Sequence, residues 1–249
     1  MQLNFAPREV TIKLVYYGPA LSGKTTNLRA LHSLTSAESR GRLMTLETKD
    51  DRTLFFDMLP LVFRAEDGKG NSMSLRVKVF TVPGQVLHAS TRRLVLQGAD
   101  GVAFIADSQV SETQANAASF LDLRDNLTEL GVSLKDMPLI IQFNKRDLPN
   151  IRSDGEIEAL AKKGREPVFK AAAVTGPGVL ESFFGLLQLT WARLEKEHQL
   201  SKNLGIEADG FLPMVATKVG FAGDVWSLLS SRVGGAIDTP KSRPAAERA

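Results

Sequence analysis

Blocks of apolar and polar positions alternate along the chain and predict strands and helices in turn. The apolar, β-branched run at residues 10–17 predicts a buried strand, and leucines three residues apart within 24–34 predict a helix. The same reasoning predicts helices at 86–97, 113–130, 153–163 and 179–198, and strands at 61–65, 74–82, 101–106, 139–143 and 168–174. Strands separated by helices of this length predict an α/β fold, a doubly wound and mostly parallel sheet with helices on both faces. The ligand crevice of such a sheet lies at the carboxyl ends of its strands.

Two stretches depart from this alternation. Residues 66–71 carry the Gly and Asn content of a hairpin turn, so the strands on either side are expected to form an antiparallel pair at the sheet edge. Residues 45–61 combine charge with aromatic bulk, which is unusual for a loop, and we interpret this stretch as a loop with a function.

Residues 199–249 are expected to form a C-terminal extension of a domain that spans residues 1–198. Asp224 would cap a short helix at about 224–233. Because this helix has no basic face, we expect it to pack or to dock a partner rather than to bind lipid. The polar stretch 238–249 contains two prolines and is expected to be disordered.

Composition narrows the class of protein. The 249 residues are 43% hydrophobic and 24% charged, which is enough apolar material for a full core. The net charge of +3 is spread among nearly as many acids as bases, without a run of five like charges, so nucleic acid is not an expected partner. No apolar run reaches the roughly 18 residues that a membrane helix needs. With no cysteine and no targeting signal at the N-terminus, a cytoplasmic location is expected.

The first chemical motif is the octapeptide at residues 18–25, which reads G-x-x-x-x-G-K-[ST] directly after the first predicted strand. This pattern is typical of a phosphate-binding loop, whose backbone N–H groups and following helix together form an anion site. Lys24 would reach the β and γ phosphates, and the Thr25 hydroxyl would ligate Mg²⁺. The residues expected to bind the phosphates are Gly18, Ala20, Leu21, Ser22, Gly23, Lys24, Thr25 and Thr26.

A second motif, N-K-x-D at Asn144, Lys145 and Asp147, follows the predicted strand at 139–143. A carboxylate at Asp147 would accept two hydrogen bonds from guanine, whereas adenine has no donor at the equivalent ring nitrogen. Four polar residues after a strand are otherwise an ordinary turn. Downstream of a phosphate-binding loop, however, this motif favours guanine nucleotides.

Four segments, VYYGP at 15–19, DRTLFFD at 51–57, TVPGQ at 81–85 and NKRDLP at 144–149, resemble small Ras-like GTPases, and among them the bacterial MglA-like gliding and polarity GTPases. The resemblance runs from about residue 8 to 198. It implies a Ras-like P-loop GTPase fold and a GTP/GDP switch with Mg²⁺ and two mobile segments, at 45–57 and 84–93. It also implies a roadblock-type, MglB-like activating partner, motility or polarity effectors, recruitment to a cell pole, and a role in cell polarity and gliding or pilus-driven motility.

The resemblance also assigns roles to residues. Thr53 is similar to the first-switch threonine that ligates Mg²⁺ together with Thr25, and Gly84 joins the nucleotide contacts. Arg52 resembles an arginine finger supplied by the chain itself, and Gln85 resembles the glutamine that orients the attacking water. The alternative for Arg52 is a surface arginine paired with a neighbouring aspartate. A backbone N–H at Ala173 or Val174 would contact the base.

Two positions depart from the Ras-like pattern. Thr81 stands where an aspartate usually holds a water on Mg²⁺, and we hypothesise that Asp57 compensates; the alternative role for Asp57 is to cap a strand. Ala20 stands where glycine is usual, and its methyl group is expected to crowd the γ-phosphate and slow hydrolysis. Two other functions remain in view: a GTP-dependent scaffold with negligible hydrolysis, and, less favoured because N-K-x-D selects guanine, a small nucleotide kinase.

Overall fold

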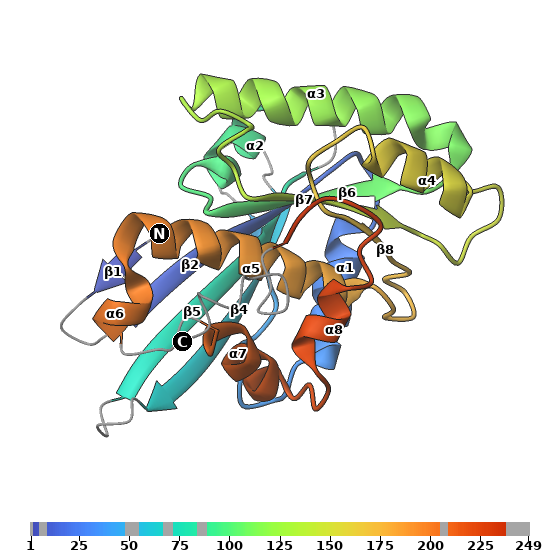
Figure 1. The fold of residues 1–249 in the computed structure, drawn as a ribbon. Helices are drawn as coiled ribbons and strands as arrows, with labels where there is room; N and C mark the ends of the chain where they lie inside the picture. The colour runs from blue at the N-terminus through green and yellow to red at the C-terminus, as the bar shows by residue number, and fades with distance from the viewer. Residues whose placement is uncertain are drawn as a thin grey trace.

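A single mixed sheet forms the centre of the computed structural model, which describes residues 2–4, 9–47, 55–66, 72–83, 89–204 and 209–237 (Figure 1). The strand order is β3-β4-β5-β2-β6-β7-β8, and β1 pairs with β2. Strands β5, β2, β6, β7 and β8 are parallel, whereas β4 runs antiparallel to both of its neighbours. The strands are β1 Gln2–Asn4, β2 Glu9–Tyr17, β3 Met44–Glu47, β4 Phe55–Glu66, β5 Ser72–Thr81, β6 Gly101–Asp107, β7 Leu139–Asn144 and β8 Val168–Lys170.

Helices cover both faces of this sheet and enclose two hydrophobic cores. Alternate residues of β2 point to opposite faces, so Ile12 and Leu14 join the core under α1, α5, α7 and α8, whereas Val15 and Tyr17 join the core under α2, α3 and α4. The helices are α1 Lys24–Leu34, α2 Ala89–Leu96, α3 Thr113–Glu129, α4 Asp154–Ala161, α5 Val179–His198, α6 Leu200–Leu204, α7 Phe211–Val219 and α8 Val225–Leu229, with a 3-10 turn at Val110–Glu112. The expected doubly wound α/β fold is confirmed.

The observed bounds agree closely with the sequence prediction where helices and strands alternate. Helices α1 and α5 have the predicted bounds, and β6 and β7 are each one residue longer than predicted. The predicted strand at 168–174 is wrong, because β8 ends at Lys170. Beyond it the backbone turns into the ligand crevice, where Ala171 O accepts from Arg146 N and Ala173 N donates to the Asn144 side chain. Those bonds replace the ladder that a longer strand would need.

The interpretation of residues 45–61 as a loop is also wrong. Strand β3 occupies its beginning and β4 starts at Phe55, while residues 48–54 lie outside the described part. Asp57 is tolerated within β4 because hydroxyl groups on other elements bond to both of its carboxylate oxygens. The outer strand of the sheet is therefore β3, and the predicted antiparallel pair of β4 and β5 lies one strand further in.

The C-terminal region contains more helix than predicted. The helix expected at 224–233 is α8, whose Asp224 side chain accepts a hydrogen bond from Trp226 N at 3.1 Å. Its Val225 and Leu229 side chains are buried in the core under α5, as expected for a packed helix. Helices α6 and α7 were not predicted. Residues 86–88 of the helix predicted at 86–97, and the tail at 238–249, lie outside the described residues.

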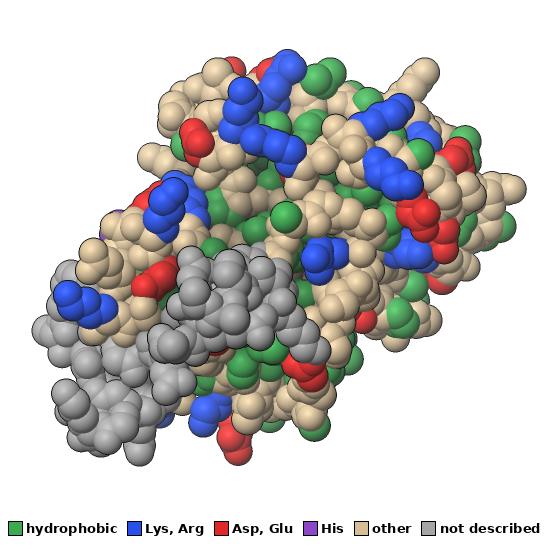
Figure 2. All heavy atoms as spheres, in the orientation of Figure 1, with side chains coloured by type: hydrophobic (Ala, Val, Ile, Leu, Met, Phe, Trp, Pro, Cys, Tyr) green, Lys and Arg blue, Asp and Glu red, His purple; other side chains and the backbone are tan. Residues whose placement is uncertain are grey.

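Basic and acidic side chains are interspersed among the described residues on the face shown in Figure 2. In the part of the chain that the structure describes, no helix is both long and apolar enough to cross a membrane.

Candidate nucleotide-binding site

The loop between β2 and α1 takes the conformation that its glycines permit. Gly18 has φ 146° and Gly23 has φ 95°, and both values favour glycine over residues that carry a Cβ. A Cβ on Gly18 would lie 2.2 Å from Ile105 O, and a Cβ on Gly23 would lie 2.2 Å from Asn144 Nδ2. Helix α1 has no side-chain cap, so its first backbone N–H groups remain available to an anion. The loop therefore has the geometry of a phosphate cradle.

Lys24 is buried under this loop and points its ammonium group at backbone carbonyls. Its Nζ donates to Gly18 O at 2.9 Å and to Pro19 O at 2.6 Å, and no carboxylate among the described residues pairs with it. Burial, together with the nearby positive charge of Arg92, lowers the pKa of Lys24 to about 8. A cation held only by carbonyl dipoles gains strongly from an anionic ligand.

Four oxygen-bearing side chains meet beside Lys24. Asp57 Oδ2 accepts from Thr25 Oγ1 at 2.5 Å, and Asp57 Oδ1 accepts from Thr45 Oγ1 at 2.8 Å. Asp57 N donates to Thr81 Oγ1 at 2.9 Å. Lys24, Thr25, Asp57 and Thr81 line a cavity of about 330 Å³. Asp57 thus lies where the hypothesis of compensation for Thr81 requires it, because it is bonded to both Thr25 and Thr81.

This donor set fits Mg²⁺. Hydroxyl and carboxylate oxygens are the ligands that Mg²⁺ prefers, and Mg²⁺ sites usually combine one or two protein groups with phosphate oxygens and water. Thr25 and Asp57 supply one hydroxyl and one carboxylate at the edge of the phosphate cradle. The second expected metal ligand, Thr53, lies outside the described residues, as do Arg52, Gly84 and Gln85.

The N-K-x-D motif lies at the end of β7 and joins three loops. The Asn144 side chain is buried, donates to Ser22 O at 2.9 Å and accepts from Ala173 N at 3.0 Å. Lys145, with φ 65°, forms an ion pair of 2.5 Å with Asp107 Oδ2. The motif therefore ties the phosphate-binding loop to the loop after β8.

Asp147 differs from its neighbours in the motif. Its side chain is exposed, and within the described part of the chain it makes no hydrogen bond or ion pair. Of the two residues expected to offer a backbone N–H to the base, Ala173 already donates to Asn144. Val174 follows it with a side chain that is 75% exposed, and no described group accepts its N–H. Asp147 and Val174 are thus the groups left available for a ligand at this end.

A partly buried charge network beside the phosphate-binding loop was not predicted from the sequence. Arg92 of α2 contacts Asp122 of α3 through two nitrogens, at 2.8 and 3.1 Å, and Tyr17 OH donates to the same carboxylate. Burial and the Asp122 contact raise the pKa of the Tyr17 phenol. A cavity of about 330 Å³ separates this network from Ala20. No sequence signal marks it, because the two ion-pair partners lie on different helices and form no motif.

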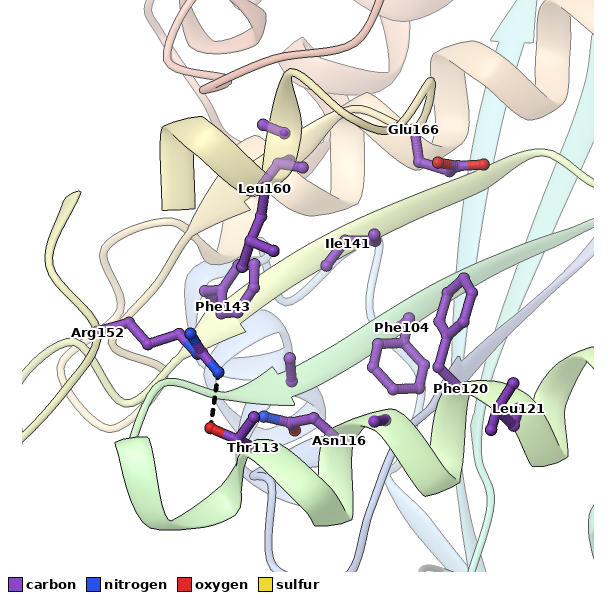
Figure 3. Close-up of a pocket in the computed structure, with 15 residues that line it drawn as sticks. Phe104, Thr113, Asn116, Phe120, Leu121, Ile141, Phe143, Arg152, Leu160 and Glu166 are labelled. Atoms are coloured by element: carbon purple, nitrogen blue, oxygen red, sulfur yellow. Dashed lines mark hydrogen bonds between the residues drawn. The ribbon is translucent and has the colours of Figure 1, made fainter. Parts of the chain in front are cut away.

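A larger cavity, of about 480 Å³, lies between α3 and α4 over β6 and β7 (Figure 3). Phe104, Phe120 and Phe143 line it, and Arg152 at its edge donates to Thr113 Oγ1 at 2.6 Å. This cavity is mainly apolar and contains neither the phosphate-binding loop nor the N-K-x-D motif. Its chemistry is not that of a nucleotide site.

Comparison with known proteins agrees with this arrangement of motifs. No family model matches the chain. The chain is 43% identical over 194 residues to the mutual gliding-motility protein MglA of Myxococcus xanthus (strain DK1622), a match that covers 78% of this chain and 97% of that protein. Identity of this degree over nearly the whole relative shows common descent. The chain belongs to the MglA family of small Ras-like GTPases.

Proposed function

We propose that this protein is a molecular switch that binds GTP and hydrolyses it to GDP and phosphate. The observation that carries the proposal is the position of Asn144, whose amide bonds to Ser22 O in the phosphate-binding loop and to Ala173 N beside the base site. One buried side chain thus holds the phosphate end and the base end of a single crevice together. A guanine nucleotide has the length and the chemistry to contact both ends.

The residues that would hold the nucleotide follow from this geometry. Phosphates would contact Lys24 and the N-terminal N–H groups of α1, and the base would contact Asp147 and the Val174 N–H. Mg²⁺ would be held by Thr25 and Thr53, with Asp57 accepting hydrogen bonds from its water ligands. When bound, the metal neutralises phosphate charge and orients the γ-phosphate. Kinase chemistry is not favoured, because no acceptor site for a second substrate accompanies these groups among the described residues.

Hydrolysis is assigned to two residues by the family resemblance. Gln85 would orient the attacking water, and the Arg52 guanidinium would stabilise charge that develops on the transferred phosphoryl group. Both act in the transition state, so both should affect the rate more than nucleotide affinity.

The biological role proposed here rests on the relative. The MglA name indicates gliding motility, and we propose that this chain likewise regulates cell polarity and gliding or pilus-driven motility. A roadblock-type, MglB-like protein would stimulate hydrolysis, and the switch would act in the cytoplasm with recruitment to a cell pole. We further propose that the catalytic domain spans residues 1–198 and that 199–249 form an extension.

Single-turnover GTP hydrolysis, measured with and without a roadblock-type activator, tests the proposed function. Gln85→Leu and Arg52→Ala should each retain GTP but slow activator-stimulated hydrolysis by a factor on the order of 10² or more. Gln97→Leu, at an exposed position just after α2, and Arg124→Ala, at an exposed position of α3, are the matched controls and should hydrolyse GTP normally. GTP binding without measurable turnover under either condition would instead support the GTP-dependent scaffold.

A further inference from the structure

The C-terminus of α7 is bound by the segment that follows α1. Ser36 N donates to Val219 O at 2.8 Å, and the hydroxyls of Ser36 and Ser39 both donate to Lys218 O, at 2.7 and 2.6 Å. Carbonyl groups in the last turn of a helix lack partners within that helix. Two serines that are remote from α7 in the sequence therefore donate hydrogen bonds to the carbonyl groups at its C-terminus.

The same segment is bonded on its other side to β4. Ser39 O accepts from Val62 N at 2.8 Å, and Gly41 N donates to Pro60 O at 2.8 Å. Pro60 approaches so closely that a Cβ on Gly41 would lie 2.6 Å from Pro60 Cγ. Ser39 is thus a junction, because its hydroxyl binds α7 while its carbonyl binds β4.

Strand β4 continues from this contact to the candidate metal site. Asp57 lies on β4, five residues before Val62, and bonds to Thr25 at the start of α1. Figure 1 shows α7 beside β4, and contacts between the two elements agree with this view. Hydrogen bonds and one continuous strand therefore connect the end of α7 with Asp57.

The C-terminal segment, residues 209–237, is itself fastened to the opposite half of the molecule. Phe211 of α7 stacks on Trp191 of α5, with ring centroids 3.7 Å apart. At the other end, Val233 N donates to Val168 O at 2.7 Å and Val168 N donates to Gly234 O at 3.2 Å. The segment thus connects two parts of the molecule. It contacts α5 and β8, and it also contacts the serine segment that bonds to β4.

We propose that this C-terminal segment is a built-in positioning element for the Mg²⁺–nucleotide site, with Ser36 and Ser39 as the positioning residues. It holds β4, and with it Asp57, against Thr25, so that docking of α7 strengthens retention of the nucleotide. The inference rests on the proposed GTP-binding function. The MglA match covers 78% of this chain, so part of the chain has no matched counterpart in that relative.

The test uses the full chain with Ser36→Ala and Ser39→Ala combined, which removes two hydroxyl donors and leaves the backbone bonds of the segment in place. Hydrogen exchange of the β4 amides should become faster. Release of a fluorescent GDP should also become faster, and the Mg²⁺ concentration that half-maximally slows release should rise by about three- to tenfold, a coupling of ordinary size. Ser36→Ala alone is the milder variant if the double variant folds poorly, and it should show the same changes more weakly.

Thr190→Val is the matched control, because the Thr190 hydroxyl, like that of Ser39, is buried and donates to a backbone carbonyl, Leu186 O, at 2.8 Å. It should leave the Mg²⁺ dependence unchanged even if it lowers the unfolding temperature. Unchanged GDP release in the serine variants, or an equal change in Thr190→Val, would overturn the positioning role. A parent chain that does not bind GDP would contradict the proposed function instead, and hydrogen exchange of β4 would then decide the positioning role by itself.

Discussion

The two ends of the nucleotide crevice are built in different ways. At the base end, Asn144 and Lys145 are engaged by the chain itself, through Ser22, Ala173 and Asp107, while Asp147 is exposed and has no partner among the described residues. At the phosphate end, by contrast, the groups expected to bind the ligand are themselves bonded to the chain. Lys24 is bonded to carbonyls of its own loop and Asp57 to the Thr25 hydroxyl, so both groups must exchange partners to receive phosphate and metal.

This difference separates selectivity from switching. A base end whose supporting hydrogen bonds do not change can distinguish bases without a conformational step, since its readers are already placed. A phosphate end whose groups exchange partners couples ligand binding to movement of the elements that carry them, here β4 and the start of α1. The resemblance assigns the mobile segments to the same end, at 45–57 and 84–93. We therefore expect substitutions at the two ends to fail in different ways.

Replacement of Lys24 should give the largest effect. Lys24→Ala should lower GTP affinity by about 2–5 kcal/mol or more, because a buried phosphate loses its nearest cation. The unfolding temperature of the protein without nucleotide should not fall, because burial disfavours the charged lysine in the folded chain. Titration calorimetry and thermal melting measure the two quantities. Unchanged affinity would contradict the phosphate-loop assignment.

The pH dependence of the parent protein supplies a control for this prediction. Lys24 has a pKa of about 8 in the folded chain against an ordinary value of 10.5. The unfolded chain therefore binds more protons between these values, and this lysine makes stability without nucleotide rise as pH increases from about 8 towards 10.5. Below pH 8 its unfavourable contribution is present in full. In Lys24→Ala this component of the pH dependence should disappear.

Replacement of Asp147 should give a smaller and more selective effect. Asp147→Asn should weaken GTP binding by roughly 1.5–3 kcal/mol, the range for hydrogen bonds to a charged group, and should favour xanthosine triphosphate, whose carbonyl oxygen can accept from the amide. Stability should not change, because the side chain is exposed and unpaired among the described residues. Competition binding with both nucleotides measures the preference. Asp136→Asn is the matched exposed control, and a retained guanine preference in Asp147→Asn would remove Asp147 as the base reader.

The fold was predictable from the sequence in some parts of the chain and not in others. Where helices and strands alternate along the chain, apolar periodicity was enough to predict them, because buried strands and amphipathic helices each show their own repeat. Strand β3 did not, because its four residues, Met44–Glu47, are held by pairing with β4 and not by a hydrophobic pattern of their own. Helix α7 was not predicted because Pro213, a residue that usually ends a helix, lies within its apolar run. Proline is tolerated there, since it lies in the first turn, where a backbone N–H has no helical partner.

The site was predictable where a motif contains its own chemistry. The phosphate-binding loop and N-K-x-D each predict candidate ligand-contacting groups within a few consecutive residues, and the structure places both motifs at one crevice. The partners that hold those groups come from distant elements, as Ser22 and Ala173 do for Asn144, and no local pattern shows them. Asp57 is an intermediate case. The sequence suggested that it supplies the carboxylate that Thr81 lacks, but only the folded sheet places it beside Thr25.

The smallest expected effect concerns Ala20, which lies on the phosphate side of the comparison. The residue is exposed and lines the cavity bounded by Arg92 and Asp122. Its methyl group therefore projects into open space beside the loop. If catalytic groups must share that space in the transition state, the methyl hinders their assembly more than it hinders GTP itself.

Ala20→Gly should then hydrolyse GTP a few times faster with little change in GTP affinity, at a cost of about 0.4–1 kcal/mol in stability from added chain freedom. Ala20→Val, which enlarges the same side chain, should hydrolyse GTP more slowly than the parent. Single-turnover rates at saturating activator rank the three proteins, and thermal melting separates steric from stability effects. A rate for Ala20→Gly at or below that of the parent would mean that the catalytic groups reach the γ-phosphate by another path, most simply with Arg52 arriving from the first switch. Position 20 would then affect only the stiffness of the loop, and the exchange of partners at Asp57 and Lys24 would be the step at the phosphate end to test next.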